Sequence, residues 1–587
     1  MALTNSVNDF DIARGQAQPF EPITAYLARQ AQRDEPAFTF IDYSTDRHGA
    51  PHTLSWSELN DRVRTVAAAV GEATDPGQRV AILAGQDLDY VVSFLGALRA
   101  GVIAVPLFAP EVSMHQNRLV GALADCSAEV WLTSEGALDG VRQLADDQPV
   151  PHPKQIITVD SLEHRSGAGT GQADIDLDRP AYLQYTSGST RNPAGAVISH
   201  RAIVTNAWQA HRAYGIDQSF TCTGWIPFFH DMGLVQLLCL PVFTGARAVF
   251  TTPMSFIRKP SRWLRQLSDY PNTMSAAPNF AYEYAVRKIS EEDRATLDLS
   301  GVRVLINGSE PVRSSTINAF AETFRQCGLR PEAHRPSYGL AEATVFVTAA
   351  RARGPVMITA DRAALGDGRL VPADGADGVE LVSAGVPTGQ HVRIVDTERH
   401  TAQPDGAVGE IWINGPNVAD GYWQAPERSA DMFEAELRDA TDVPARGWLR
   451  TGDLGVVHDG ELYITGRMKD LIIIDGKNHY PQDIESTVHS AHPAIRPDHV
   501  AAFPVESNDR EAIVVIAELG RHAEQEELDS TQVAGAVRKA VTARHEVKLH
   551  DLVLVPAGSV LRTSSGKIAR AANKKRYLAE LSPSAGA

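Results

Sequence analysis

Apolar residues up to about Ala350 alternate between a helical period and the shorter pattern of buried strands. The clearest unit has strand patterns at 79–83 and 102–106 on either side of a helical pattern at 89–100. A strand, helix, strand order predicts a parallel sheet covered by helices. The same alternation predicts further strands at 130–133, 181–185, 196–198, 248–251, 302–305 and 333–336, and a helix at 201–213.

Two later parts of the chain follow different patterns. Residues 392–395, 409–413 and 462–464 alternate apolar and polar side chains, as antiparallel strands do. From about Lys469 the pattern predicts helix 481–491, strand 512–518, helix 531–544 and strand 552–555, enough for a separate domain. The expected fold class is therefore α/β: a large N-terminal domain of α/β sheets with a β-rich subdomain, then a small α+β C-terminal domain.

A polar turn at 186–195 lies between the two central strands, and four of its first five residues, all except Gly188, are Ser or Thr. Gly188 and Gly195 permit close backbone approach, and the hydroxyl and amide donors suit the oxygens of a polyphosphate. The turn is not a Walker loop, because no Gly-Lys-Ser/Thr opens a helix here. Taken alone it is also compatible with an ordinary Ser/Gly hairpin.

Two more polar loops follow predicted strands, Asn307-Gly308-Ser309-Glu310 and the stretch from Ser337 to Thr344. Open α/β sheets bind ligands at the carboxyl ends of adjacent strands. Tyr338 offers a flat face for an adenine, and a carboxylate such as Glu342 suits a hard cation that bridges phosphates. Segment 275–280 is expected to start a helix, and segment 448–453 to form a tight turn that presents Asp453 to the hydroxyls of a ribose.

Composition narrows the functional classes. The formal net charge of the 587 residues is -17, which argues against general nucleic-acid binding. No apolar run approaches the roughly 20 residues that a membrane span needs, so no span is expected. The N-terminus has no signal-peptide pattern, and Cys126, Cys222, Cys239 and Cys327 have no paired metal spacing. These features favour a reduced, cytoplasmic location.

Motifs in the order QYTSGSTRNPAG, WIPFFHDMG, SAAPNF, NGSEP, SYGLAEAT, WLRTGD and RTSSGKIAR extend over most of the chain. In this order they resemble the acyl-adenylate-forming superfamily, which includes acyl-CoA ligases, adenylation domains and luciferases. The first two motifs are similar to those of fatty acyl-AMP ligases, a branch that usually lacks the lysine for which this chain has Ala194. Leu561 replaces the usual proline before the last motif, which is expected to alter loop stiffness more than chemistry.

The resemblance implies ATP and Mg²⁺ as cofactors and a role for each motif. It implies catalytic roles for Lys567, His230 and Glu342, metal binding by Glu342 and Thr186, and a hinge at Lys469. The implied acyl channel is lined by Met232, Ser275, Ala276 and Phe280. The implied nucleotide-binding residues are Thr186, Ser187, Gly188, Ser189, Thr190, Asn307, Gly308, Ser309, Glu310, Ser337, Tyr338, Gly339, Asp453 and Arg467.

The implied domains are 1–466, a hinge at 467–469 and a mobile lid at 470–587. An insertion at about 352–385, long and irregular in sequence, is expected to restrain the lid and disfavour CoA as acceptor. The implied reaction converts a medium- or long-chain fatty acid to acyl-AMP with release of pyrophosphate. The acyl group then passes to an acyl carrier protein of a polyketide or peptide synthase.

Two other functions are weighed against this one. A fatty acyl-CoA ligase would transfer the acyl group to CoA. A catalytically inactive nucleotide-binding sensor or scaffold would be favoured by loss of Lys567, Glu342 or Asp453, and all three are present. An acidic carrier protein would need a local basic face on this acidic chain. Candidates for that face are Arg562, Lys567, Arg570, Lys574, Lys575 and Arg576.

Overall fold

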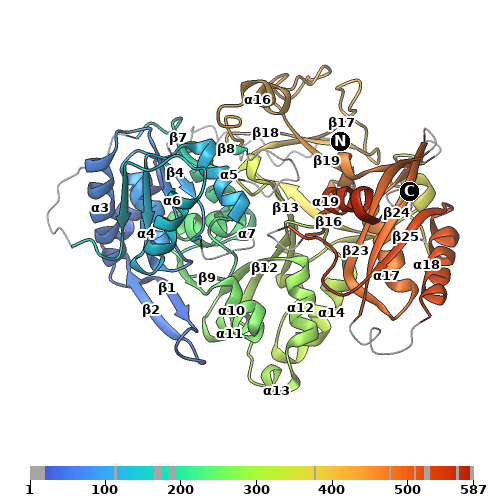
Figure 1. Cartoon of the computed structure of the whole chain (residues 1–587), viewed down its shortest axis with the longest axis horizontal. Helices are drawn as coiled ribbons and strands as arrows, with labels where there is room; N and C mark the ends of the chain where they lie inside the picture. The colour runs from blue at the N-terminus through green and yellow to red at the C-terminus, as the bar shows by residue number, and fades with distance from the viewer. Residues whose placement is uncertain are drawn as a thin grey trace.

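The computed structural model (Figure 1) describes residues 20–110, 116–163, 175–185, 194–375, 378–474, 477–507, 510–520, 529–563 and 567–581. Strands and helices alternate through the first two thirds of the chain, antiparallel strands follow, and a small α+β unit ends it. The α/β class and its large and small parts are confirmed.

The first sheet has the strand order β6-β5-β3-β4-β7-β8. Its first five strands are parallel and β8 runs antiparallel to β7. The strands are β3 (Arg79–Ile82), β4 (Ile103–Pro106), β5 (Val130–Thr133), β6 (Gln155–Thr158), β7 (Pro180–Tyr185) and β8 (Gly195–Ser199). The helices of this region are α2 (Ile23–Gln30), α3 (Trp56–Ala73), α4 (Leu88–Arg99), α5 (Gln116–Cys126) and α6 (Leu138–Asp147).

Helices cover both faces of this sheet because successive strand residues point to opposite sides. Val80 and Ile82 belong to the main core with α3 and α4, whereas Ala81 packs with α5 and α6 on the other face. The sequence also fixes where the helices begin. A capping box of Ser55 and Glu58 starts α3, and the Asp87 carboxylate accepts two backbone N–H bonds at the start of α4.

A second sheet contains the parallel run β13-β12-β11-β9-β10-β1, with β2 antiparallel at its edge. Its strands are β1 (Pro36–Asp42), β2 (Ala50–Ser55), β9 (Thr221–Gly224), β10 (Arg247–Phe250), β11 (Thr273–Pro278), β12 (Val302–Gly308) and β13 (His334–Tyr338). The helices of this region are α7 (His200–Tyr214), α8 (Asp231–Leu234), α9 (Leu240–Thr244), α10 (Pro253–Arg258), α11 (Ser261–Asp269), α12 (Asn279–Lys288), α13 (Glu291–Arg294) and α14 (Ser314–Phe324).

Beyond β13 the same sheet continues with antiparallel strands in the order β14-β16-β20-β19-β18-β17. These are β14 (Thr348–Ala349), β16 (Val379–Pro387), β17 (His391–Val395), β18 (Gly409–Asn414), β19 (Leu449–His458) and β20 (Glu461–Arg467). β15 (Met357–Ala360) pairs with β16, and α15 (Arg362–Gly366) and α16 (Pro426–Phe433) complete this part.

The small C-terminal part is drawn orange to red at the right of Figure 1. It has a hairpin of β21 (Ile472–Ile474) and β22 (Lys477–His479) and a sheet in the order β23-β24-β25. The remaining elements are β23 (Ile495–Ser507), β24 (Arg510–Leu519), β25 (Leu549–Val555), α17 (Pro481–Ala491), α18 (Ser530–His545) and α19 (Arg570–Arg576). Its apolar core, with Ile484, Val515 and Val537 fully buried, is separate from the main one.

Two local predictions are wrong. Residues 275–280 start as strand β11, and α12 begins only at Asn279, because a short fully buried apolar run has no periodicity that separates strand from helix. Asp453 lies inside strand β19 and not after a tight turn. Gly452, with φ 68°, sits where the pairing of β18 and β19 shifts register, so a β-bulge turns the backbone there.

The four cysteines are buried as free thiols. None of the helices in the described part of the chain combines the length and the apolar character that a membrane-spanning helix requires.

Candidate functional site

The candidate site lies along the carboxyl ends of four neighbouring parallel strands, β9, β11, β12 and β13. Each strand is followed by one of the polar motifs of the sequence: 225–233, 279–280, 308–311 and 338–344. Because parallel strands end on the same edge of the sheet, motifs about 110 residues apart in sequence become neighbours. Topology therefore assembles the site.

His230 and Asp231 form a close pair after β9. His230 Nδ1 lies 2.6 Å from Asp231 Oδ1, and His230 is the N-cap residue of α8. Burial alone would raise the pKa of Asp231, but the His230 ring and the Lys567 ammonium together hold it below its ordinary value. The buried carboxylate therefore stays charged and fixes the orientation of the ring.

Tyr338, Asp453 and Arg467 meet at the junction between the parallel and antiparallel parts of the sheet. The Tyr338 hydroxyl donates to Asp453 Oδ2 at 2.8 Å, and Arg467 Nε lies 2.9 Å from Asp453 Oδ1. Asp453 and Arg467 are direct partners in the β19–β20 ladder. Three residues predicted to bind the nucleotide are thus in contact, with the buried Asp453 between the other two.

The bulge that presents Asp453 is held by a carboxylate that the sequence analysis missed. Glu410 is buried and accepts bonds from Gly452 N at 3.0 Å, Arg450 Nε at 3.0 Å and Trp412 Nε1 at 2.8 Å. Three donors on one buried carboxylate restrain the backbone on both sides of the bulge.

Glu342 lies in the loop after β13 with one carboxylate oxygen engaged: Tyr422 donates its hydroxyl to Glu342 Oε1 at 2.7 Å. Buried side-chain amides also hold this loop. Asn206 and Asn417 both donate to the carbonyls of Ala343 and Phe346, at 3.0 to 3.4 Å. The amide network continues to Gln209 and Gln390.

Two glycines at this edge leave no room for a side chain. A Cβ on Gly339 would lie 1.5 Å from Val345 O, and one on Gly308 would lie 2.6 Å from Ser337 O. The sequence analysis assigned both to nucleotide binding. The structure shows an additional reason for glycine, which is that the site loops pack backbone against backbone.

Two predicted nucleotide residues direct their side chains elsewhere. Asn307 is fully buried, and its Nδ2 lies 3.4 Å from Asn279 Oδ1 and 3.1 Å from His334 Nε2. Ser337 bonds the Tyr214 hydroxyl at 2.8 Å and donates to Arg335 O at 3.0 Å. These side chains support the strand ends from opposite faces of the sheet, and the assignment of Asn307 and Ser337 to the nucleotide stays a prediction.

A narrow cavity lies between α8 and the strands β9 and β11, and Met232 and Ala276 line it. Ser275 does not, because it is on the opposite face of β11, where it accepts from Trp263 Nε1 and donates to Thr223 O, both at 2.8 Å. The assignment of Ser275 to the acyl channel is therefore corrected. Phe280, in the first turn of α12, lies beside Trp225.

Lys567 approaches the site from the small domain. Its ammonium lies within the electrostatic reach of Asp231, Glu310, Asp453 and Arg467. Burial, reinforced by Arg467, lowers the pKa of Lys567 below its ordinary value. Thr563 N donates to Lys567 O at 2.8 Å, and Lys567 N donates to Thr563 Oγ1 at 3.1 Å. A desolvated cation is thus directed at the groups predicted to surround the reacting phosphate.

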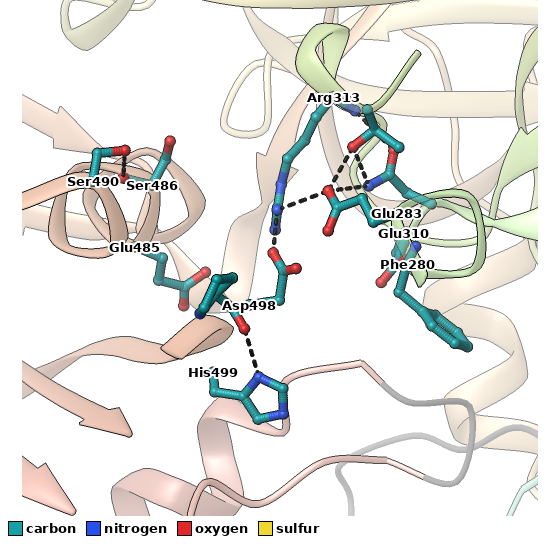
Figure 2. Close-up of polar contacts among 12 residues, drawn as sticks. Phe280, Glu283, Glu310, Arg313, Glu485, Ser486, Ser490, Asp498 and His499 are labelled. Atoms are coloured by element: carbon teal, nitrogen blue, oxygen red, sulfur yellow. Dashed lines mark hydrogen bonds and ion pairs between the residues drawn. The ribbon is translucent and has the colours of Figure 1, made fainter. Parts of the chain in front are cut away.

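Figure 2 shows the contact between the two domains next to this site. Arg313 of the large domain lies between Glu283, at 3.3 Å, and Asp498 of the small domain, with which it forms an ion pair. Nearby, Glu310 accepts from Phe280 N at 2.6 Å, and burial raises its pKa. Arg562 donates to the backbone carbonyl of Asp498. The sequence analysis had no signal for Arg313, because it lies outside every motif.

The inserted stretch also contacts the small domain. Arg362 of α15 forms an ion pair with Asp483 of α17, and the Tyr480 hydroxyl donates to Leu365 O at 3.4 Å. Leu365 and Tyr480 share a small buried cluster with Leu454 of β19. The insertion therefore packs between the β-rich subdomain and the small domain.

Other predictions have mixed outcomes. The phosphate-binding turn from Thr186 to Thr190 lies outside the described residues, as do Ser187, Gly188 and Ser189 within it. Ser309, at φ 68°, follows β12 directly, and Lys469 lies in a single 3₁₀ turn after β20.

The basic face is smaller than predicted, because Arg570 is enclosed by Glu485 and Asp470. Of the six predicted residues Lys575 is exposed, and the others are half-buried.

Comparison with known proteins places these observations in a family. Residues 27–423 match the model of the AMP-binding enzyme family, and residues 469–584 match the Disco-interacting protein 2-like AMP domain. The chain is 44% identical over 583 residues to the long-chain-fatty-acid–AMP ligase FadD26 of Mycobacterium marinum, covering 94% of this chain and 97% of that protein.

A second curated relative and a solved structure are also similar to this chain over most of its length. The long-chain-fatty-acid–AMP ligase FadD32 of Mycolicibacterium smegmatis is 42% identical, covering 95% of this chain and 94% of that one. The crystal structure of a fatty acyl-adenylate ligase from L. pneumophila, in complex with acyl adenylate and pyrophosphate, is similar with a TM-score of 0.73 at 31% identity. It covers 95% of this chain and 96% of that one.

Proposed function

Because the chain belongs to the AMP-binding enzyme family, we propose that it is a fatty acyl-AMP ligase. It activates a medium- or long-chain fatty acid with ATP, releases pyrophosphate, and transfers the acyl group to an acyl carrier protein. The observation that carries this proposal is the position of Lys567, a desolvated cation from one domain among Asp231, Glu310, Asp453 and Arg467 of the other.

The reaction needs charge neutralisation more than a protein nucleophile. A carboxylate oxygen of the fatty acid attacks the α-phosphorus of ATP. The new bond joins that oxygen to phosphorus, and the bond from the α-phosphorus to the bridging oxygen breaks as pyrophosphate leaves. Negative charge accumulates on the α-phosphate, and Lys567 is placed to stabilise it. His230, oriented by Asp231, closes the site over the carboxylate.

The nucleotide would be held by the groups at the β13 and β19 ends. Asp453 accepts hydrogen bonds from the ribose hydroxyls, its charge balanced by Arg467, and Tyr338 stacks on the adenine. Glu342 fits Mg²⁺: Tyr422 engages one of its carboxylate oxygens, and the other would be offered to the hard cation, whose positive charge would balance that of the phosphates. Thr186 is the second proposed ligand.

The acyl acceptor is inferred from the insertion. The contacts of Arg362 and Leu365 with the small domain support a restraint on its rotation. CoA transfer requires the small domain to turn and expose a new surface, so a restrained lid favours a carrier protein over CoA. Lys574 and Lys575 on α19 offer the positive charge that an acidic carrier protein would contact.

The test is product analysis by mass spectrometry. The protein is incubated with ATP, Mg²⁺ and fatty acids of graded length, with CoA, with a phosphopantetheinylated carrier protein, or with neither. Accumulation of acyl-AMP that CoA leaves unconsumed and the carrier consumes is the expected result. Rapid formation of acyl-CoA would make the chain an acyl-CoA ligase. Absence of any adenylate would overturn the proposal.

A further inference from the structure

The cavity beside Met232 contains a polar group that the proposed reaction does not use. Gln236 lines this cavity together with Thr223, Ile226, Met274 and Ala276. It is 3% exposed, and its Oε1 has no hydrogen-bond partner among the described residues. A buried amide oxygen without a partner is destabilising, so its presence in the wall of this cavity requires an explanation.

The rest of the wall offers no competing polar group. The Thr223 hydroxyl is occupied, because it donates to Met274 O at 3.1 Å, and Ile226, Met232, Met274 and Ala276 are apolar. A wholly unsubstituted acyl chain would therefore leave the Gln236 amide unpaired and would displace any water that bonds it. A chain with a hydroxyl would replace that water's hydrogen bonds.

The backbone holds Gln236 in place. Residues Val235–Cys239 form a π-helix, a widened turn that is frequent at functional sites. The preceding turn packs tightly, since a Cβ on Gly233 would lie 2.2 Å from Pro227 O. Gln236 follows Met232 by one turn, about 6 Å along the helix axis, so an acyl chain whose carboxylate lies at His230 would meet this amide at a distance from that carboxylate.

We propose that Gln236 is a specificity-determining residue that recognises a hydroxyl on the acyl chain, so the preferred substrates are fatty acids hydroxylated in mid-chain. A hydroxyl both donates to Oε1 and accepts from the amide N–H₂, so it satisfies the side chain whichever way the amide is turned. This inference rests on the proposed function, because it names the substrate class of the same site.

The experiment compares dodecanoic acid with its monohydroxylated isomers at carbons near, midway along and at the end of the chain. Pyrophosphate release gives kcat/KM for each acid with the wild type, Gln236→Met and Met274→Leu. Gln236→Met keeps the length of the side chain and removes the amide. Met274→Leu is the matched control, which changes the same wall without changing its polarity.

We expect the wild type to prefer one mid-chain hydroxy acid over dodecanoic acid by about tenfold or more. Gln236→Met should reduce that ratio to about one or below, and Met274→Leu should retain it. The ratio is taken within one preparation, so a smaller folded fraction does not change it. If Gln236→Met does not fold, the preference of the wild type for one hydroxyl position over the others decides whether the inference holds.

Equal or better use of dodecanoic acid by the wild type would overturn the inference, as would an unchanged ratio in Gln236→Met. Either result leaves the proposed function intact, because dodecanoic acid is still adenylated. Failure to adenylate any of the acids would instead overturn the proposed function, and the inference with it.

Discussion

The loop that carries Glu342 and the domain contact around Arg313 border the same site but are stabilised in different ways. The loop is held by neutral buried amides, with Asn206 and Asn417 fully enclosed. The domain contact is held by charges, with Arg313 between two carboxylates. Hydrogen bonds between buried neutral groups respond little to salt and pH, whereas ion pairs respond to both. The loop is thus expected to be insensitive to salt and pH, and the contact with the small domain to respond to both.

The largest effect should come from the positive charge that the small domain contributes to the site. Lys567→Ala should lower the rate of adenylation by about 100- to 1000-fold, because it removes a desolvated cation from the developing charge on the phosphate. Pyrophosphate release measures it. The control is Lys575→Ala, which removes an exposed lysine of the same domain and should leave adenylation unchanged. A loss under about tenfold in Lys567→Ala would remove Lys567 from the mechanism.

The next effect should come from the amides. Asn417→Ala should lower the free energy of unfolding by about 3 kcal/mol, since Gln209 and Gln390 each lose a partner in a buried site. Chemical denaturation at low and high salt measures this loss, which should be the same at both. Asn414→Ala removes a surface amide of the same region and should cost about 1 kcal/mol or less. Equal losses in the two variants would contradict a special role for the network.

The domain contact should depend on pH through Glu283. Burial, with the Asp498 carboxylate beside it, raises the pKa of Glu283 from 4.5 to about 7. A carboxyl whose pKa is raised in the closed form binds its proton more tightly there, so closure is favoured in full below about 4.5 and loses this contribution as pH rises through about 7. Energy transfer between a dye on each domain should show the closing equilibrium constant fall about tenfold from pH 6 to pH 8.

Glu283→Gln is the control for this titration, because it cannot ionise and should give a flat response over the same range. Arg287 and His489 also lie near Asp498 and Arg313 and must be kept intact in the labelled protein. A wild-type response that equals that of Glu283→Gln would assign the pH dependence to another group.

The smallest effect should come from the insertion. Arg362→Met removes the ion pair with Asp483 and keeps the aliphatic contact, so the small domain should turn more freely. We expect acyl-CoA formation to rise by a few-fold from a low background, with adenylation unchanged. Arg369→Met, on the same inserted stretch, is the control and should not raise it. No increase in CoA transfer would mean that this ion pair does not restrain the lid.

The sequence patterns predicted the order of the elements well, because period and length separate long helices from strands. Helix 481–491 and strand 130–133 match the structure residue for residue. Side-chain direction was predicted less well. Asn307 and Ser275 both lie in strands of the right motifs but face the core, and a motif does not state which of two alternating faces meets the ligand.

The residues that support the site from a distance were not predictable at all. Asn417 is 74 residues from the carbonyl of Ala343 that it bonds, and Glu410 is 42 residues from Gly452. Nothing local distinguishes these polar residues from surface ones until the sheet brings their partners to them. Tyr422, which bonds Glu342 across 80 residues, is a further example.

The connection between β20 and the small domain has a consequence for the timing of the reaction. Arg467 is the last residue of β20 and bonds Asp453, and the proposed hinge residue Lys469 follows two positions later. A ligand bound to Asp453 would therefore compete with Arg467 or strengthen its contact with Asp453. Arg467 ends the strand that leads to the proposed hinge. Binding or release of the ribose at Asp453 would therefore be coupled to rotation of the proposed lid through the ion pair that Asp453 shares with Arg467.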